Sequence, residues 1–265
     1  MFRRIRNRYV LLRNMRKMFW WKYGWNLKSN KESFSMHLLA IRNTQYVQLV
    51  EICVRSFLFW HPNSQITIHG DRTTLPRLRP IFKDLLNNQS KNFVLMDVND
   101  DVKEPWQKTK MKLILSLKPN EIFMDADLRW NGVIPFKSRI PIFFSSEFQI
   151  CEKSPYRQMM QLLQLTPSTE AIMRNVSFFS FGDFDVSESF AAEVWELWET
   201  YQNLLSSEIF GRDDRANLSR LIEQFLLSVF VPLKLGDSLS LKKLDRHLDG
   251  EFVESCYFGA TGFTF

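Results

Sequence analysis

The sequence has few of the residues on which disulfide-rich and zinc-stabilised folds depend. Its three cysteines, Cys53, Cys151 and Cys256, lie about a hundred residues apart and form no CxxC pair, which excludes a zinc ribbon and a thioredoxin-like site. No apolar run approaches the roughly 18–20 residues needed to span a bilayer, and the N-terminus lacks the apolar region of a secretory signal. A Gly-rich phosphate loop, HExxH and GxSxG are absent too. We therefore expect a cytosolic protein with free thiols.

The composition and the distribution of charge divide the chain in two. With 45% apolar and 14% aromatic residues in 265, the chain is long and apolar enough to bury a core. Residues 1–33 carry ten Lys or Arg and one acid, whereas the rest carries 25 basic and 28 acidic residues, a net of −3. We expect a basic arm over residues 1–33 and one domain over residues 34–265.

The arm has the pattern of an amphipathic helix. Its apolar residues recur at three- and four-residue steps and share one stripe: Ile5, Tyr9, Leu12, Met15 and Phe19. Basic residues occupy the other faces, and four aromatic residues follow before residue 26. This pattern indicates that residues 1–25 bind an anionic membrane surface, so that the protein is peripheral on the cytosolic face. The alternative is a helix packed on the domain with solvated charges. No recognition motif continues into the body, so we expect no nucleic-acid partner.

From residue 34 the chain alternates between short apolar runs and helical periodicity. The spacing predicts strands over residues 37–41, 65–69, 93–98 and 121–124, and helices over 44–60, 75–88 and 106–117. The less regular second half predicts strands over 140–146 and 176–181, and helices over 188–205 and 218–230. Strands that alternate with helices form βα units, so the fold class we expect is α/β, with a mostly parallel sheet covered by helices.

The strongest sign of chemistry is an acidic pair at the end of the fourth strand. Asp125 and Asp127 follow the apolar run Ile122–Met124 directly. Side chains two residues apart on an extended chain point to the same side, and two carboxylates so close repel each other unless a cation joins them. Oxygen ligands favour Mg²⁺ or Mn²⁺, which take part of their shell from substrate phosphates. The alternative is that the two acids only cap a turn.

The segment around this pair resembles a group of known enzymes. Lys110–Asn131 (KMKLILSLKPNEIFMDADLRWN) is similar to the DxD segment of glycosyltransferases of the GT-A fold, and a weaker resemblance covers Phe34 to about Phe230. Asn175–Ser177 stands in place of an "NxG" strand, and Leu221–Ser228 resembles a late "EQxxLS" helix. The resemblance implies a GT-A-like, Rossmann-like domain that transfers a sugar from a nucleotide-diphosphate donor to a glycan or lipid-linked acceptor.

The resemblance also implies roles for the residues of the DxD strand. Asp125 and Ala126 would contact the donor, and Asp125 and Asp127 would bind Mn²⁺ or Mg²⁺. Several retaining families complete the metal shell with a late histidine, but here Cys256 stands in that place, and a thiolate is a poor ligand for Mg²⁺. His247 is the nearest histidine upstream, so the third ligand is His247, Cys256 or water.

Two further groups would act on the donor and the acceptor. Lys108 or Lys110, in the helix that leads to the DxD strand, would reach the phosphates or the sugar, although these lysines could also form a solvated face. Glu223 would lie near the acceptor, as a general base in an inverting enzyme or as a sugar-orienting group in a retaining one. Its alternative is a surface glutamate.

Two other functions remain open at this point. Phosphohydrolases of the haloacid-dehalogenase type also place DxD after an apolar strand, and Gly182–Asp185 (GDFD) resembles their later acidic motif. A non-catalytic scaffold with a transferase fold at a membrane is the third interpretation, favoured by Cys256 and opposed by the intact acidic pair.

Overall fold

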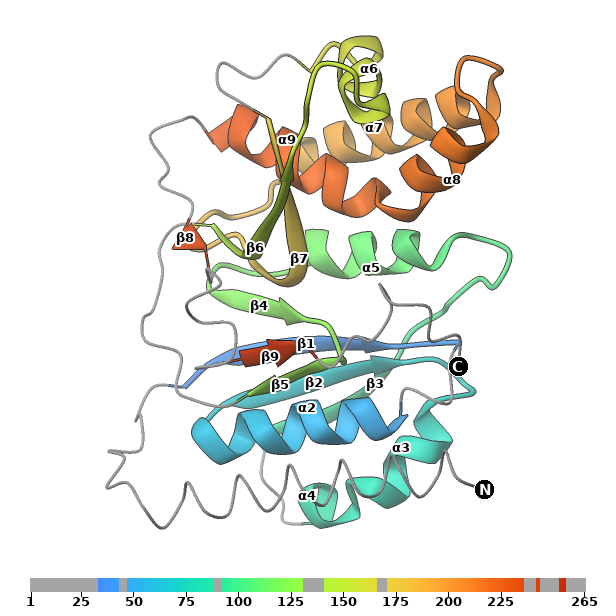
Figure 1. Ribbon diagram of the computed structural model, residues 1–265. Coiled ribbons are helices and arrows are strands. Elements are labelled where there is room, and N and C mark those ends of the chain that lie inside the picture. The colour runs from blue at the N-terminus through green and yellow to red at the C-terminus, as the bar shows by residue number, and fades with distance from the viewer. Residues whose placement is uncertain are drawn as a thin grey trace.

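The computed structural model describes residues 33–42, 47–87, 92–130, 141–165, 171–235, 242–243 and 253–255 (Figure 1). The expected basic arm therefore lies outside the described residues apart from Ser33, and so do His247 and Cys256. The boundary we expected between the arm and the domain stays a prediction.

Seven strands form one sheet in the order β3-β2-β1-β4-β7-β6-β8. Their bounds are Ser35–Ala40 (β1), Gln65–Gly70 (β2), Phe93–Asp97 (β3), Glu121–Met124 (β4), Ile142–Gln149 (β6), Ile172–Ser180 (β7) and Lys242–Lys243 (β8). The β1–β2, β1–β4, β2–β3 and β6–β8 pairs are parallel, and β7 is antiparallel to both β4 and β6. Six strands thus run one way and β7 runs the other, which confirms the mostly parallel sheet.

Helices cover the sheet on both faces (Figure 1). One face is covered by α2 (Val47–Trp60), α3 (Leu75–Ile81) and α4 (Lys83–Asn87). The opposite face is covered by α5 (Trp106–Leu115), α6 (Pro155–Leu162), α7 (Glu188–Ser206), α8 (Arg212–Arg220) and α9 (Ile222–Leu235). Strand β4 separates two hydrophobic cores: Ile122 and Met124 belong to the core on the α2 side, and Phe123 belongs to the core of the later helices. This is the covered sheet of α/β proteins, and it confirms the expected α/β fold class with a mostly parallel sheet covered by helices.

Two of the predicted helices are wrong in extent. The helix expected over 75–88 is two helices, α3 and α4, and α3 contains Pro80, which has no N–H to continue the ladder. The helix expected over 218–230 is also wrong, because α8 ends before Leu221 and α9 begins after it. Leu221 adopts φ −116° and ψ 22°, which turns the chain so that Ile222 and Glu223 enter the interior.

A second, two-stranded sheet was not predicted. It pairs β5 (Leu128–Trp130) with β9 (Val253–Ser255) in antiparallel register. The backbone of Trp130 is also tied to α2, because its N–H donates to Ser56 Oγ at 3.0 Å and its carbonyl accepts from Trp60 Nε1 at 3.0 Å. The stretch that follows the acidic pair is therefore fixed on the α2 side.

Candidate active site

The acidic pair lies where the order of the strands reverses. The chain builds β1, β2 and β3 outward in one direction, and then α5 returns it to the other side of β1, where β4 pairs. Open α/β sheets bind their ligands outside the carboxyl ends of the strands at such a switch point. Asp125 is the first residue after β4, so the fold places it at the position where a ligand is expected.

The backbone of Asp125 is anchored to the neighbouring strand. Its N–H donates to the carbonyl of Ser177 in β7 at 2.6 Å, which continues the β4–β7 ladder beyond Met124. The expected "NxG"-like segment, Asn175–Ser177, is thus beside the acidic pair. The Asn175 side chain accepts a hydrogen bond from the Ser177 N–H at 2.7 Å. The sheet itself therefore sets the position of the first carboxylate.

Lys110 brings its ammonium group to this carboxylate from α5. Lys110 Nζ lies 3.0 Å from Asp125 Oδ2 and 3.8 Å from Glu223 Oε1, and the residue is 2% exposed. The ammonium also lies 5.0 Å from the centre of the Phe123 ring and 5.8 Å from that of Trp106. Burial opposes its charge, but the attraction of Asp125 and Glu223 outweighs burial and raises the pKa of Lys110.

Asp127 is the acid of the pair whose charged form the surroundings disfavour. Burial, and then repulsion from Asp125, raises the pKa of the Asp127 carboxyl from 3.8 to about 7. Its Oδ1 atom is buried and has no hydrogen-bond partner among the described residues. A buried carboxylate oxygen without a donor is costly, so this atom is suited to contact a cation.

Glu223 completes the cluster from α9. It lies in the first turn of the helix, where the partial positive charge of the helix N-terminus favours an anion. The residue is only 3% exposed, so the alternative of a surface glutamate is wrong. Residues on α5, α9 and the end of β4 therefore converge, although they lie up to 113 positions apart in the sequence.

The charges of this cluster do not balance. Asp125, Asp127 and Glu223 supply three carboxylates around the single ammonium of Lys110. When all are ionised the cluster carries a net charge of −2, which one divalent cation would neutralise. Within the described ranges no group of three or more His, Cys, Asp or Glu side chains is arranged to hold a metal. The role of Asp125 and Asp127 as metal ligands therefore stays a prediction.

The remaining predicted site residues have other surroundings. Lys108 Nζ pairs with Glu104 at 3.0 Å and Glu199 at 3.7 Å, so it is Lys110 and not Lys108 that reaches the acidic pair. Ala126 is buried in the core on the α2 side, which leaves its backbone as the part that a donor could contact. The expected metal ligand His247 and its alternative Cys256 lie outside the described residues.

The acidic motif of the phosphohydrolase interpretation lies at the wrong edge of the sheet. The carbonyl of Gly182 accepts a hydrogen bond from the N–H of Asn120 at 2.7 Å. Asn120 precedes the amino end of β4, whereas Asp125 follows its carboxyl end. Asp183 and Asp185 therefore sit beside the opposite end of the strand from Asp125, and the two acidic motifs do not form one site.

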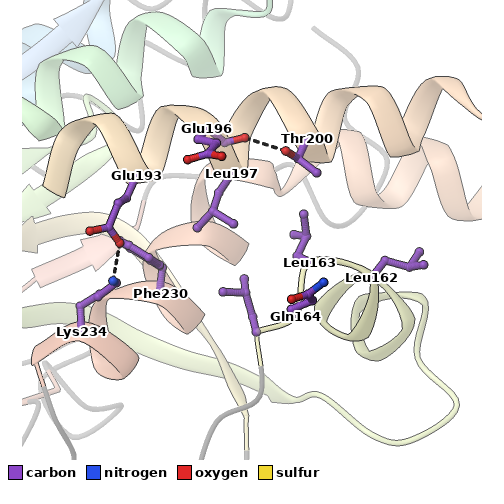
Figure 2. A pocket seen from close by; sticks show the side chains of 10 residues that line it. Leu162, Leu163, Gln164, Glu193, Glu196, Leu197, Thr200, Phe230 and Lys234 are labelled. Carbon is purple, nitrogen blue, oxygen red and sulfur yellow. Dashed lines mark hydrogen bonds and ion pairs between the residues drawn. The ribbon is translucent and has the colours of Figure 1, made fainter. Parts of the chain in front are cut away.

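A separate cavity of about 420 Å³ lies among the later helices (Figure 2). Figure 2 shows Leu163 of the α6 end and Leu197 of α7 pointing into it, with an ion pair between Glu193 and Lys234 at its side. None of the predicted site residues lines this cavity. It is therefore distinct from the acidic cluster at the switch point.

Sequence reasoning missed an arginine at the carboxyl end of the sheet. Arg42 follows β1, and its guanidinium donates to both oxygens of Asp100 at 2.6 and 2.8 Å. It also donates to the carbonyls of Asp101 at 2.6 Å and Glu104 at 2.7 Å. Its N–H donates to Asp71 Oδ2 at 2.7 Å. The acidic loop at residues 99–101 was a signal of this contact, but nothing in the sequence named its partner.

Comparisons with known proteins find similarity only to solved structures. No protein-family model and no curated protein matches the chain. The galactosyltransferase LgtC, solved in complex with donor and acceptor sugar analogues, aligns with 71% of this chain and 70% of its own at 11% identity and a TM-score of 0.44. GlyE of Streptococcus pneumoniae aligns with 82% of this chain and 46% of its own, at 10% identity and a TM-score of 0.44. The bifunctional WbbM aligns with 77% and 38%, at 9% identity and a TM-score of 0.40. At TM-scores below 0.5 these similarities say nothing about function.

Proposed function

We propose that the chain is a metal-dependent glycosyltransferase that moves a sugar from a nucleotide-diphosphate donor to a glycan or lipid-linked acceptor. The observation that carries this proposal is the cluster at the switch point between β1 and β4, where three carboxylates surround one buried ammonium. A site with this excess of negative charge suits a divalent cation that is shared with a diphosphate.

Asp125 and Asp127 are the residues that would hold Mn²⁺ or Mg²⁺. Bound there, the ion would supply charge stabilisation to the departing nucleotide diphosphate. The unpartnered Oδ1 of Asp127 supports this assignment. Lys110 keeps the Asp125 carboxylate in place at 3.0 Å, so this carboxylate does not have to reorganise when the donor arrives.

The transfer exchanges one bond for another at the anomeric carbon of the donor sugar. The hydroxyl oxygen of the acceptor forms a bond to that carbon, and the bond from the carbon to the diphosphate oxygen breaks. The electron pair of the broken bond leaves with the diphosphate. The hydroxyl proton goes to Glu223 in an inverting enzyme, or to the departing diphosphate oxygen in a retaining one, where Glu223 orients the sugar. The position of Glu223 next to Lys110, which contacts Asp125, supports a role close to the bound donor.

We further propose that residues 1–25 hold the enzyme at an anionic membrane face, where a lipid-linked acceptor would be presented. The basic, amphipathic pattern of these residues supports the proposal. No helix in the described part of the chain is long and apolar enough to cross a membrane.

A thermal-shift panel tests the enzymatic assignment. UDP-, GDP- and CMP-sugars are added to the full chain with and without Mn²⁺, and inorganic phosphate is added in parallel. A ligand present at about 100 times its dissociation constant contributes roughly 2.7 kcal/mol, which raises the Tm of a chain of this size by roughly 5–10 °C. We expect such a shift for a nucleotide-diphosphate sugar, and only with Mn²⁺.

Two variants make the result specific. Asp127→Asn removes a metal ligand and should abolish the Mn²⁺-dependent shift. Asp185→Asn changes an exposed aspartate at the opposite end of β4 and should leave the shift intact. A shift with phosphate alone would indicate a phosphohydrolase, and silence with every ligand would indicate a scaffold.

A further inference from the structure

Two apolar residues are exposed on the connection from β3 to α5, and one of them, Trp106, lies beside the charged cluster. Trp106 is 42% exposed and Val102 is 71% exposed, and both are among the large apolar residues with the greatest exposure in the described part of the chain. Trp106 opens α5, and its ring lies 5.8 Å from Lys110 Nζ, which itself contacts Asp125. The exposed indole is thus one side chain away from the candidate reaction centre.

The loop that carries these residues is held rigidly. Arg42 binds the carbonyls of Asp101 and Glu104, which flank Val102 and Lys103 on both sides. Asp100, whose side chain is fully buried, receives two bonds from Arg42 and one from Thr109 of α5 at 2.8 Å. Val102 is therefore exposed at the tip of a fixed loop and is not exposed by disorder.

Arg42 adopts an uncommon backbone conformation to make these contacts. Its φ is +62°, in the left-handed region that non-glycine residues seldom occupy. The Asp71 carboxylate holds the Arg42 N–H in this conformation. The strained backbone of Arg42, the buried carboxylate of Asp100 and several hydrogen bonds thus hold a loop whose tip is apolar. Such preorganisation is typical of a binding surface.

We propose that the exposed indole of Trp106 is a platform for a sugar ring of the acceptor. The proposal rests on the proposed glycosyltransferase function and names where its acceptor binds. The C–H face of a pyranose ring packs on an indole because both surfaces are apolar. The hydroxyl groups at the edge of the same ring would face the neighbouring charged cluster.

The charge of the loop favours a neutral sugar over a nucleotide at this platform. Residues 97–104 contain four acids, Asp97, Asp100, Asp101 and Glu104, and one lysine, Lys103. Arg42 pairs with Asp100 and Lys108 pairs with Glu104. Asp97 and Asp101 then stand against Lys103 alone, and this small excess of negative charge disfavours a phosphate group. The platform therefore suits the uncharged acceptor, while the donor diphosphate binds at the carboxylates with its metal.

The test is ¹⁹F NMR on the full chain labelled with 5-fluorotryptophan. The chain has eight tryptophans, and the resonance that disappears in Trp106→Phe belongs to Trp106. Methyl β-D-glucopyranoside, methyl β-D-galactopyranoside and methyl α-D-mannopyranoside are titrated into the protein, with glycerol as a control for polyol effects. We expect at least one glycoside to shift the Trp106 resonance saturably while glycerol leaves it in place. If no glycoside moves it, or if UDP moves it and the glycosides do not, the proposal is overturned.

Kinetics give a second measurement. With a donor identified by the thermal-shift panel, Trp106→Ala should raise the acceptor KM about tenfold, equivalent to roughly 1.4 kcal/mol, and leave the donor KM within twofold. Trp106→Phe should recover most of the loss, whereas Ile209→Ala, which changes another exposed apolar residue (48%) after α7, should have no effect. An unchanged acceptor KM in Trp106→Ala contradicts the platform. A chain that binds no nucleotide sugar but still shows the ¹⁹F shift contradicts the proposed function and leaves the platform standing.

Discussion

The raised pKa of Asp127 makes a quantitative prediction for stability. The carboxyl has a pKa of about 7 in the folded protein and 3.8 as its ordinary value, and each unit is worth 1.36 kcal/mol. Because the folded state holds this proton more tightly than the unfolded state, the free energy of unfolding falls as the pH rises from about 4 to about 7. The full loss is roughly 4 kcal/mol. Asp127→Asn removes the ionisable group and should therefore remove this loss.

Urea denaturation between pH 4 and pH 8, in EDTA, measures the effect. We expect Asp127→Asn to match the wild type near pH 4 and to exceed its free energy of unfolding by up to roughly 4 kcal/mol at pH 8. Asp185→Asn, at an exposed position, should follow the wild type throughout. The reasoning is refuted if Asp127→Asn and the wild type lose stability in parallel as the pH rises.

Mn²⁺ should restore the stability that the wild type loses at high pH, and it should not stabilise Asp127→Asn. A divalent cation at Asp125 and Asp127 favours both charged forms and so lowers the pKa of Asp127. At pH 8, Mn²⁺ in place of EDTA should raise the Tm of the wild type and leave Asp127→Asn almost unchanged. An equal rise in the two proteins would mean that the ion binds elsewhere.

Three other predictions concern the charged contacts and the arm. Lys110→Met should lower the free energy of unfolding at pH 8 by about 3 kcal/mol, since it leaves buried carboxylates without the Lys110 ammonium. In urea denaturation this loss should be smaller at pH 5, and a loss that does not depend on pH would contradict the assignment. Arg42→Lys should lower the free energy of unfolding by about 2 kcal/mol because Lys cannot reproduce the bidentate bond to buried Asp100. Arg55→Lys, at a half-exposed pair with Asp84, should lower it by under about 1 kcal/mol. Equal losses in urea denaturation would refute the difference. Deletion of residues 1–25 should release the protein from anionic liposomes in a sedimentation assay, and undiminished sedimentation would rule out the membrane role.

The local parts of this fold could be predicted from the sequence. Strand β4 and the acidic pair were predicted at the bounds that the structure shows, because an apolar run followed by two acids is a pattern within six residues. The start of α5 at Trp106 was predicted too. Alternation of short strands and helices was enough to predict the mostly parallel sheet.

The parts that depend on distant contacts could not be predicted. The spacing of α5 shows that Lys110 lies on a different helix face from Lys108, but not that this face is turned toward Asp125 and Glu223. Glu223 is buried because the chain bends at Leu221, and that bend is set by packing among helices. The β5–β9 pair joins residues that are more than 120 positions apart, and β9 has only three residues, Val253–Ser255.

The candidate site joins residues from both sides of the boundary between the two hydrophobic cores, and this has a consequence for motion. Asp125 directly follows β4, whereas Glu223 belongs to α9. Lys110 is the only described side chain that forms ion pairs with both. A displacement of α9 relative to α5 and β4 would change the distance of 3.8 Å between Lys110 and Glu223 and leave the contact of 3.0 Å between Lys110 and Asp125 as it is. Such a displacement would move the candidate base, Glu223, relative to the candidate metal ligands Asp125 and Asp127.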